Sequence, residues 1–273
     1  MELIFYDITQ EEYQILTTTY NSIMKNKLSL FVSILVISIV FFSCKKQEAD
    51  PIQELETNDP LYDKNQGAHI VASHLTKKLE DRKGIVMYEL TMEPGDTLPW
   101  HEHPPHTFYT LEEGTLEVIF EDSTKTSFYP EGQTNFGSPS REMAINKGET
   151  TIKMLFHDFY YLAPEEPNDP HYDVNRGAHI VAPNLTKILQ DKHGIVMYEL
   201  TIKPGETLPW HEHPLHTFYI LEEGTLEITS QNSTRTSSYF KGQTNFNNSF
   251  SDIATNIGET TIKVLMHEFY SLE

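Results

Sequence analysis

The sequence predicts an all-β protein in which one domain occurs twice, behind an N-terminal targeting segment. Two observations predict this architecture. Residues 60–162 recur at an offset of 110 residues, and 67 of the 103 aligned positions are identical. Within each copy, short runs of β-branched and aromatic residues alternate with Gly-containing turn signals. A repeat of this length far exceeds the roughly 20 to 50 residues of a solenoid unit, so it indicates a duplicated domain.

The composition fits a folded protein and excludes several classes of partner. The chain has 273 residues, enough for about two domains. Apolar residues make up 38% and charged residues 22%, which argues against a largely disordered chain. Forty acidic against 20 basic residues give a net charge of −20, so nucleic acid and anionic membrane surfaces are unfavourable partners. The single Cys excludes a disulfide framework and a Cys-based zinc site within one chain.

Residues 24–44 have the pattern of an export signal. Met24 begins a short basic segment, and an apolar run of 15 residues, interrupted only by three Ser, follows over 28–42. That length suits a signal-peptide core of about 7 to 15 residues better than a spanning helix of about 20. Cys44 comes directly after a small residue. The arrangement resembles a bacterial lipoprotein signal peptide. It implies that Cys44 is lipidated and tethers the protein to a membrane of the bacterial cell envelope; a single N-terminal membrane anchor is the alternative.

The segments around this signal complete the predicted organisation. Residues 1–23 contain four acidic residues and no Lys or Arg, the wrong charge for a signal peptide, so we interpret them as a mis-annotated upstream extension. The signal peptide is then 24–43. Residues 44–59 are polar and acidic and are predicted to be a flexible tether. A Pro-containing linker, 163–169, separates the first domain, 60–162, from the second, 170–273.

Each copy is predicted to consist of short strands. In the first copy we expect strands over 85–91, 107–111, 115–120 and 150–155, and one more after Gly132. Only 74–83 is expected to hold a short helix. Many short strands separated by turns indicate a sandwich or a barrel.

The motif that carries most chemistry lies at 94–114. In this motif Gly95 is followed after five residues by His101-x-His103, and Gly114 comes later. The second copy repeats the pattern with Gly205, His211, His213 and Gly224. This pattern resembles the first motif of the cupin superfamily. The resemblance covers both copies and implies a bicupin, two double-stranded β-helix (jelly-roll) barrels in one chain. It also implies that each barrel can hold a metal ion in its mouth.

The metal-ligand set is only partly that of the family. Two His at i and i+2 on a strand face the same side, and imidazole suits a divalent ion of Fe, Mn, Ni, Cu or Zn. The resemblance also implies a Glu ligand, but Thr107 and Thr217 occupy its position. One residue earlier, His106 and His216 are candidates for the missing ligand, although strict alternation from Thr107 would turn them outward.

The second family motif is also altered. Gly132 and Asn146 fit its two ends, but its Pro-x-Gly centre is missing. Where the family has a His four residues before the Asn, this chain has Glu142, and the second copy has Asp252. A carboxylate there would complete a site of two His and one carboxylate. The alternative is that 137–143 is a solvated loop whose acidic residues bind nothing.

Other recurring residues are interpreted as structural. His69 and His157, with their second-copy equivalents His179 and His267, belong to no family motif and are expected to be structural or surface residues. The aromatic pairs Trp100/Trp210 and Tyr109/Tyr219 are expected to form barrel wall rather than a substrate platform.

Three functions remain open at this point. The first is a metal-dependent enzyme acting on a small molecule in the cell envelope, of dioxygenase, decarboxylase or isomerase type. The second is a non-catalytic module that binds a sugar or organic acid, with or without a metal. The third is structural, with the two barrels packed as a dimer-like unit, and association into a homo-oligomer is compatible with each. Fold alone does not select among the reactions.

Overall fold

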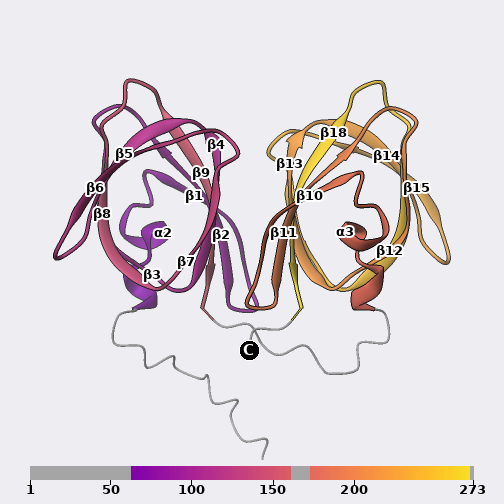
Figure 1. Ribbon diagram of the computed structural model, residues 1–273, viewed down its shortest axis with the longest axis horizontal. Helices are drawn as coiled ribbons and strands as arrows, with labels where there is room; N and C mark the ends of the chain where they lie inside the picture. The colour runs from indigo at the N-terminus through magenta and orange to yellow at the C-terminus, as the bar shows by residue number, and fades with distance from the viewer. Residues whose placement is uncertain (1–62, 161–172, 271–273) are drawn as a thin grey trace, which may run out of the picture. The chain divides into compact units, whose positions relative to one another are not determined.

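The computed structural model describes residues 63–160 and 173–270, and these form two β-barrels, one from each repeat (Figure 1). We refer to them as the first and the second barrel. The predicted upstream extension, signal peptide, tether and linker, including Cys44, lie outside the described residues.

The first barrel consists of two sheets. Its five-stranded sheet has the order β1-β2-β9-β4-β7, and its four-stranded sheet has the order β3-β8-β5-β6. All neighbouring strands are antiparallel. The elements are η1 (Lys64–Gln66), α2 (Ala68–Val71), β1 (Thr76–Arg82), β2 (Ile85–Met92), β3 (Thr97–His103), β4 (His106–Glu112), β5 (Gly114–Ile119), β6 (Thr124–Tyr129), β7 (Thr134–Gly137), β8 (Ser140–Asn146) and β9 (Ile152–Phe159).

The second barrel repeats this arrangement. Its sheets have the orders β10-β11-β18-β13-β16 and β12-β17-β14-β15. The elements are η2 (Val174–Arg176), α3 (Ala178–Val181), β10 (Thr186–Lys192), β11 (Ile195–Ile202), β12 (Thr207–His213), β13 (Leu215–Glu222), β14 (Gly224–Thr229), β15 (Thr234–Tyr239), β16 (Thr244–Asn247), β17 (Phe250–Asn256) and β18 (Ile262–Phe269).

The all-β prediction is confirmed, but the helix expected within 74–83 is wrong. This segment forms strand β1, which pairs with β2 in the register Thr76↔Leu90. Pairing with a buried neighbour overrides the local helix propensity of Lys, Leu and Glu. The helical turn lies earlier, at α2, and it packs against β1 and β3. Among the described residues, no helix has the length and apolar character needed to cross a membrane.

Each barrel has its own apolar core between its two sheets. In the first barrel two adjacent interior strands, β2 and β9, are almost entirely buried, since one face lines the barrel and the other faces the second barrel. The buried core residues of the first barrel are Ala68, Ala72, Val86, Tyr88, Leu90, Met92, Leu98, Leu116, Val118, Ala144, Ile152, Met154 and Phe156.

The two barrels belong to one compact unit and pack through their five-stranded sheets. Two apolar clusters contain residues of both barrels, one around Phe159 and Phe269 and one around Met87 and Met197. Polar contacts accompany them. The hydroxyl of Tyr109 donates a hydrogen bond to Glu199 Oε1 at 2.8 Å, and Tyr219 makes the equivalent bond to Glu89.

Candidate metal centre

A strand irregularity aims His101 and His103 into the first barrel. The register of β3 against β8 shifts between Leu98 and His101, so both of these residues face inward although they are three positions apart. His103 follows at i+2 and faces the same way. The exposed fractions of His101 and His103 are 1% and 2%. The second barrel repeats the shift between Leu208 and His211.

The hydrogen bonds of the first imidazole in each pair fix its tautomer. His101 Nδ1 lies 2.9 Å from the carbonyl oxygen of Pro99, and His211 Nδ1 lies 2.9 Å from that of Pro209. A carbonyl oxygen only accepts, so Nδ1 carries the proton and donates. Burial and the neighbouring His103 lower the pKa of His101 to about 3, so the ring is neutral at pH 7. Its Nε2 is therefore an unprotonated acceptor.

The second imidazole is held by a buried carboxylate. His213 Nδ1 donates to Glu268 Oε1 at 2.7 Å, and His103 Nδ1 lies 3.2 Å from Asp158 Oδ1. Burial alone would raise the pKa of Glu268, but hydrogen bonds from His179 and His213 lower it to about 2. An ionised carboxylate only accepts, so Nδ1 of His213 carries a proton, and in the neutral ring Nε2 is the nitrogen with the lone pair.

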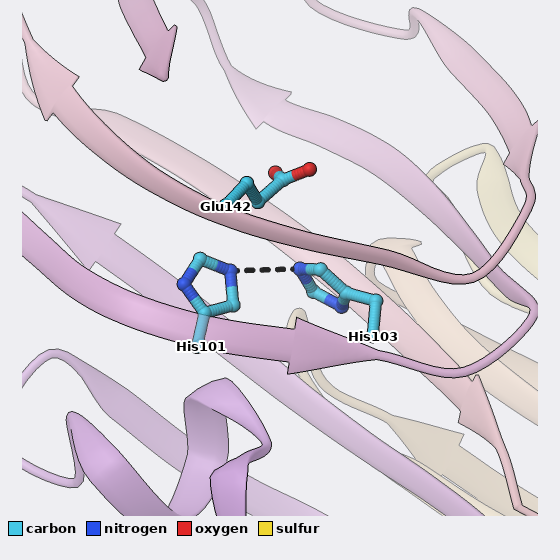
Figure 2. A group of neighbouring side chains, drawn as sticks. All are labelled: His101, His103 and Glu142. Carbon is cyan, nitrogen blue, oxygen red and sulfur yellow. Dashed lines mark hydrogen bonds between the residues drawn. The ribbon is translucent and has the colours of Figure 1, made fainter. Parts of the chain in front are cut away.

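These contacts bring the Nε2 atoms of the two imidazoles of each barrel close together. The two Nε2 atoms are 2.9 Å apart in the first barrel, joined by the dashed line in Figure 2, and 2.7 Å apart in the second. In the second barrel Asp252 Oδ1 lies 3.2 Å from His211 Nε2 and has no hydrogen-bond partner among the described residues. Buried polar atoms are nearly always paired, so this convergence of acceptors fits a bound cation.

Glu142 and Asp252 lie in strands, so the alternative of a solvated loop at 137–143 is wrong. Glu142 is opposite His101 in the β3–β8 pairing, and Asp252 is opposite His211 in the β12–β17 pairing. Figure 2 shows the Glu142 carboxylate beside the two imidazoles. Burial raises the pKa of both carboxyls. The groups His101–His103–Glu142 and His211–His213–Asp252 each bring three ligand atoms within 4.8 Å of one another.

His106 and His216 also face into their barrels. On β4, His106 and Phe108 line the first cavity, whereas Thr107 and Tyr109 bond to the second barrel. The outward orientation considered for His106 is therefore wrong, because the inward position in this strand belongs to His106 and not to Thr107. The imidazole of His106 lies 4.4 Å from that of His103, centroid to centroid.

The recurring His residues outside the motifs make structural contacts, and all but the half-buried His69 are buried. His157 and His267 stack on each other between the barrels, with centroids 3.8 Å apart. His69 and His179 lie behind the sites, where His179 Nδ1 is 3.4 Å from Glu268 Oε2. Tyr109 and Tyr219 join the barrels, and the half-buried Trp100 ring lies under the Arg141 guanidinium at 5.1 Å.

Sequence reasoning missed the carboxylates Asp158 and Glu268. Both are fully buried, in strands β9 and β18. Each stands in an otherwise mostly apolar run, directly after His157 or His267. An acid within a run predicted to be a buried strand is an available signal, because a buried carboxylate requires a partner.

Each metal-ligand group opens onto a cavity. The cavity of the second barrel has a volume of about 420 Å³ and that of the first about 280 Å³. Both have a mixed polar and apolar lining, and besides the imidazoles each contains one basic side chain, Arg235 in the second and Lys125 in the first. Volumes of this order suit a small molecule.

Comparison with known proteins gives the fold. No family model matches the sequence, and no curated protein matches it. Similar solved structures include a variant of oxalate decarboxylase from Bacillus subtilis, with TM-score 0.50 and 13% identity over 72% of this chain and 72% of that chain. AerE from Microcystis aeruginosa has TM-score 0.46 and 14% identity over 72% and 98% of the two chains. A cupin 2 conserved barrel domain protein from Leptotrichia buccalis has TM-score 0.44 and 14% identity over 71% and 88%. At these identities the likeness concerns the fold and not the activity. The described residues form two barrels of the cupin fold in tandem.

Proposed function

We propose that each barrel binds one divalent transition-metal ion and that the protein uses these ions to bind or act on a small molecule in the cell envelope. The observation that carries the proposal is the close approach of two imidazole Nε2 atoms in each barrel, 2.9 Å and 2.7 Å apart, with a carboxylate within 4.8 Å of both rings' ligand atoms. Neutral imidazole and carboxylate are the donors that Fe, Mn, Ni, Cu and Zn accept.

The ligands in this proposal are His101, His103 and Glu142 in the first barrel and His211, His213 and Asp252 in the second. Each group lines a cavity, so a small molecule that enters the barrel would meet the ion. Glu268 orients His213 through its Nδ1 and so keeps Nε2 available, a supporting role that carboxylates commonly have behind ligating imidazoles. A bound divalent ion would supply a Lewis acid next to the ligand or substrate.

Elemental analysis of the purified full chain tests the metal sites. We expect about one transition-metal ion per barrel, and loss of both ions from the double variant His101→Ala, His211→Ala. The control is His74→Ala, because His74 is exposed and outside the cavities. A protein that binds no metal and keeps its full thermal stability would instead support the alternative, a metal-free module that binds a sugar or an organic acid.

We also propose that the protein is anchored to a membrane through lipid on Cys44. The support is the sequence pattern alone: a basic start at Met24, an apolar core and a Cys directly after it. Labelled palmitate should be incorporated into the wild type and not into Cys44→Ser, and the variant should leave the membrane fraction. Incorporation of label into Cys44→Ser would contradict the proposal. Metal binding should be equal in both proteins.

A further inference from the structure

The two barrels differ at several positions around their metal-ligand groups, and two of these differences change the contacts of potential metal ligands. Where the first barrel has Gly137, the second has Asn247, and where the first has Asp158, the second has Glu268. Both differences bear on side chains that could ligate a metal. In the second barrel the potential ligand atoms of these side chains accept hydrogen bonds. In the first barrel the equivalent atoms lack them.

In the second barrel, Asn247 donates a hydrogen bond to the unprotonated nitrogen of His216. His216 Nδ1 donates to the carbonyl oxygen of Pro214 at 2.7 Å, so its Nε2 is an acceptor. Asn247 Nδ2 lies 3.2 Å from that Nε2 and donates to it. The amide is held in this orientation because Asn245 Nδ2 donates to Asn247 Oδ1 at 2.7 Å. His216 therefore has no lone pair left for a metal.

In the first barrel, the equivalent nitrogen has no such partner. His106 Nδ1 donates to the carbonyl oxygen of Pro104 at 2.9 Å, which leaves Nε2 as an acceptor. The ring lies directly against Gly137, where a Cβ atom would come within 2.3 Å of His106 Nε2. Glycine thus leaves room for the ring. Among residues 63–160 and 173–270, none donates a hydrogen bond to this Nε2.

The inner carboxylates differ in the same direction. Glu268 accepts hydrogen bonds from His213 at 2.7 Å and from the hydroxyl of Tyr198 at 2.8 Å. The shorter Asp158 contacts His103 at 3.2 Å, and the hydroxyl of Tyr88 interacts with its carboxylate, but this hydroxyl and Asp158 Oδ2 do not reach full hydrogen-bond geometry with any described residue. Asp158 is fully buried, so a carboxylate oxygen with incomplete hydrogen bonding there would be stabilised by a bound cation.

Three donors of the first barrel consequently form a second group, deeper than the first. His103, His106 and Asp158 bring their ligand atoms within 4.8 Å of one another, and all three are buried. No equivalent inner group occurs among the described residues of the second barrel. His103 belongs to both groups of the first barrel. Because a neutral imidazole has one lone pair for a metal, the barrel would hold one ion at a time.

We propose that the first barrel has two alternative positions for its metal ion, whereas the second barrel has one. The outer position is His101, His103 and Glu142, and the inner position is His103, His106 and Asp158. This inference rests on the proposed metal function. It predicts that the first barrel tolerates loss of its outer carboxylate and that the second does not.

The test measures Zn²⁺ binding to the full chain, one barrel at a time. The variant His211→Ala, His213→Ala leaves only the first barrel competent, and His101→Ala, His103→Ala leaves only the second. Equilibrium dialysis against Zn²⁺ gives affinity and stoichiometry, and circular dichroism confirms that each variant is folded. Adding Glu142→Gln to the first parent should weaken binding about tenfold or less, with one ion still bound. Adding Asp252→Asn to the second should weaken it about 100-fold or more.

Two further variants test the inner donors directly. Glu142→Gln combined with Asp158→Asn should abolish binding in the first barrel. In the second barrel, Asn247→Gly with Glu268→Asp should restore binding to the Asp252→Asn variant to within about tenfold of its parent. Equal losses in Glu142→Gln and Asp252→Asn, without restoration, would overturn the inference and leave the proposed function intact. If neither parent binds Zn²⁺, the proposed function itself is wrong.

Discussion

His157 of the first barrel stacks on His267 of the second, with ring centroids 3.8 Å apart, and each side chain is only 1% exposed. Each ring also contacts a Thr of the opposite barrel: His267 Nε2 lies 3.1 Å from Thr107 Oγ1, and His157 Nε2 lies 2.9 Å from Thr217 Oγ1. The contact between the barrels therefore centres on two imidazoles that cannot both carry a charge in that position.

The first prediction concerns acid stability. Burial lowers the pKa of His267 to about 3 and that of His157 well below its ordinary value of 6.5. Below pH 6.5 the unfolded chain takes up protons that the folded chain does not, so stability falls as the pH decreases from 6.5 toward 3. Each such His costs up to about 1.4 kcal/mol per pH unit in this range.

Thermal unfolding of the chelator-treated protein checks this prediction. The Tm should be nearly constant from pH 8 to 7 and should drop steeply between pH 6 and 4.5. The variant His157→Phe, His267→Phe keeps two stacked rings without a titratable nitrogen, and its Tm should decrease less over the same range. Parallel Tm curves for the two proteins would show that other groups, such as the buried imidazoles of the metal centres, cause the acid sensitivity.

A second prediction concerns the Tyr–Glu bonds between the barrels. Glu199 accepts from Tyr109 at 2.8 Å and pairs with Lys263 at 2.9 Å, so Tyr109→Phe removes a hydrogen bond to a buried, charged acceptor. Such bonds contribute about 1.5 to 3 kcal/mol, and the free energy of unfolding in urea should fall by that amount. Tyr129→Phe, in the wall of the first cavity, should change it by less than about 0.5 kcal/mol. Metal content should be unchanged in both.

A third prediction follows from the position of Thr107. Thr107→Glu restores the residue type that the cupin resemblance implies at this position. The side chain faces His267 of the other barrel rather than the metal centre, so the new carboxylate would be buried away from any metal. We expect a loss of about 3 kcal/mol or more and no gain in metal affinity.

Thr107→Val provides the matched control. It removes only the hydroxyl contact with His267, for a loss of about 1 kcal/mol. A Thr107→Glu protein that is as stable as the wild type and binds Zn²⁺ more tightly would place this residue at the metal and contradict the strand orientation described above.

The sequence predicted the all-β class, the tandem barrels and the metal-competent His pairs, because duplication and motif spacing are local properties of the chain. It could not establish which of His106 and Thr107 faces inward. That orientation depends on how β4 pairs with β9, where His106 is opposite Asp158 and Thr107 is opposite His157. In an unbroken strand, alternation from His103 would have predicted the orientation of His106. The Pro104–Pro105 corner interrupts the strand, so this alternation does not carry across it.

The contacts of the buried carboxylates with the metal-ligand groups could not be predicted from the sequence for a related reason. Asp158 is 55 residues from His103 along the chain and meets it only because β9 and β4 are neighbours in one sheet, beside the end of β3. A search for ligands by spacing within a motif does not reach across a barrel. Likewise, the effect of having Asn247 in one barrel and Gly137 in the other is visible only once the structure shows that His216 and His106 lie against them.

The fourth prediction concerns Asn146 and Asn256, which fit the end of the second family motif but lie away from the metal-ligand groups. Asn146 Nδ2 donates to the carbonyl oxygens of Met92 and Thr150, both at 2.9 Å, and Oδ1 accepts from the Gly148 amide at 2.9 Å. One buried side chain thus satisfies three backbone groups, one at the end of β2 and two in the turn that leads into β9. Asn146→Ala would leave these groups unpaired and should lower the free energy of unfolding by about 3 kcal/mol or more.

Urea unfolding and Zn²⁺ dialysis together distinguish this structural role from ligation. Asn146→Ala should be clearly less stable and still bind Zn²⁺ with unchanged affinity under conditions where it is folded. Asn135→Ala is a suitable comparison, since Asn135 is an exposed residue that lines the first cavity and should affect stability by less than about 0.5 kcal/mol. A side chain engaged in three backbone hydrogen bonds has no remaining atom with which to reach an ion, so loss of Zn²⁺ from folded Asn146→Ala would contradict the structural role and assign this residue to the metal centre.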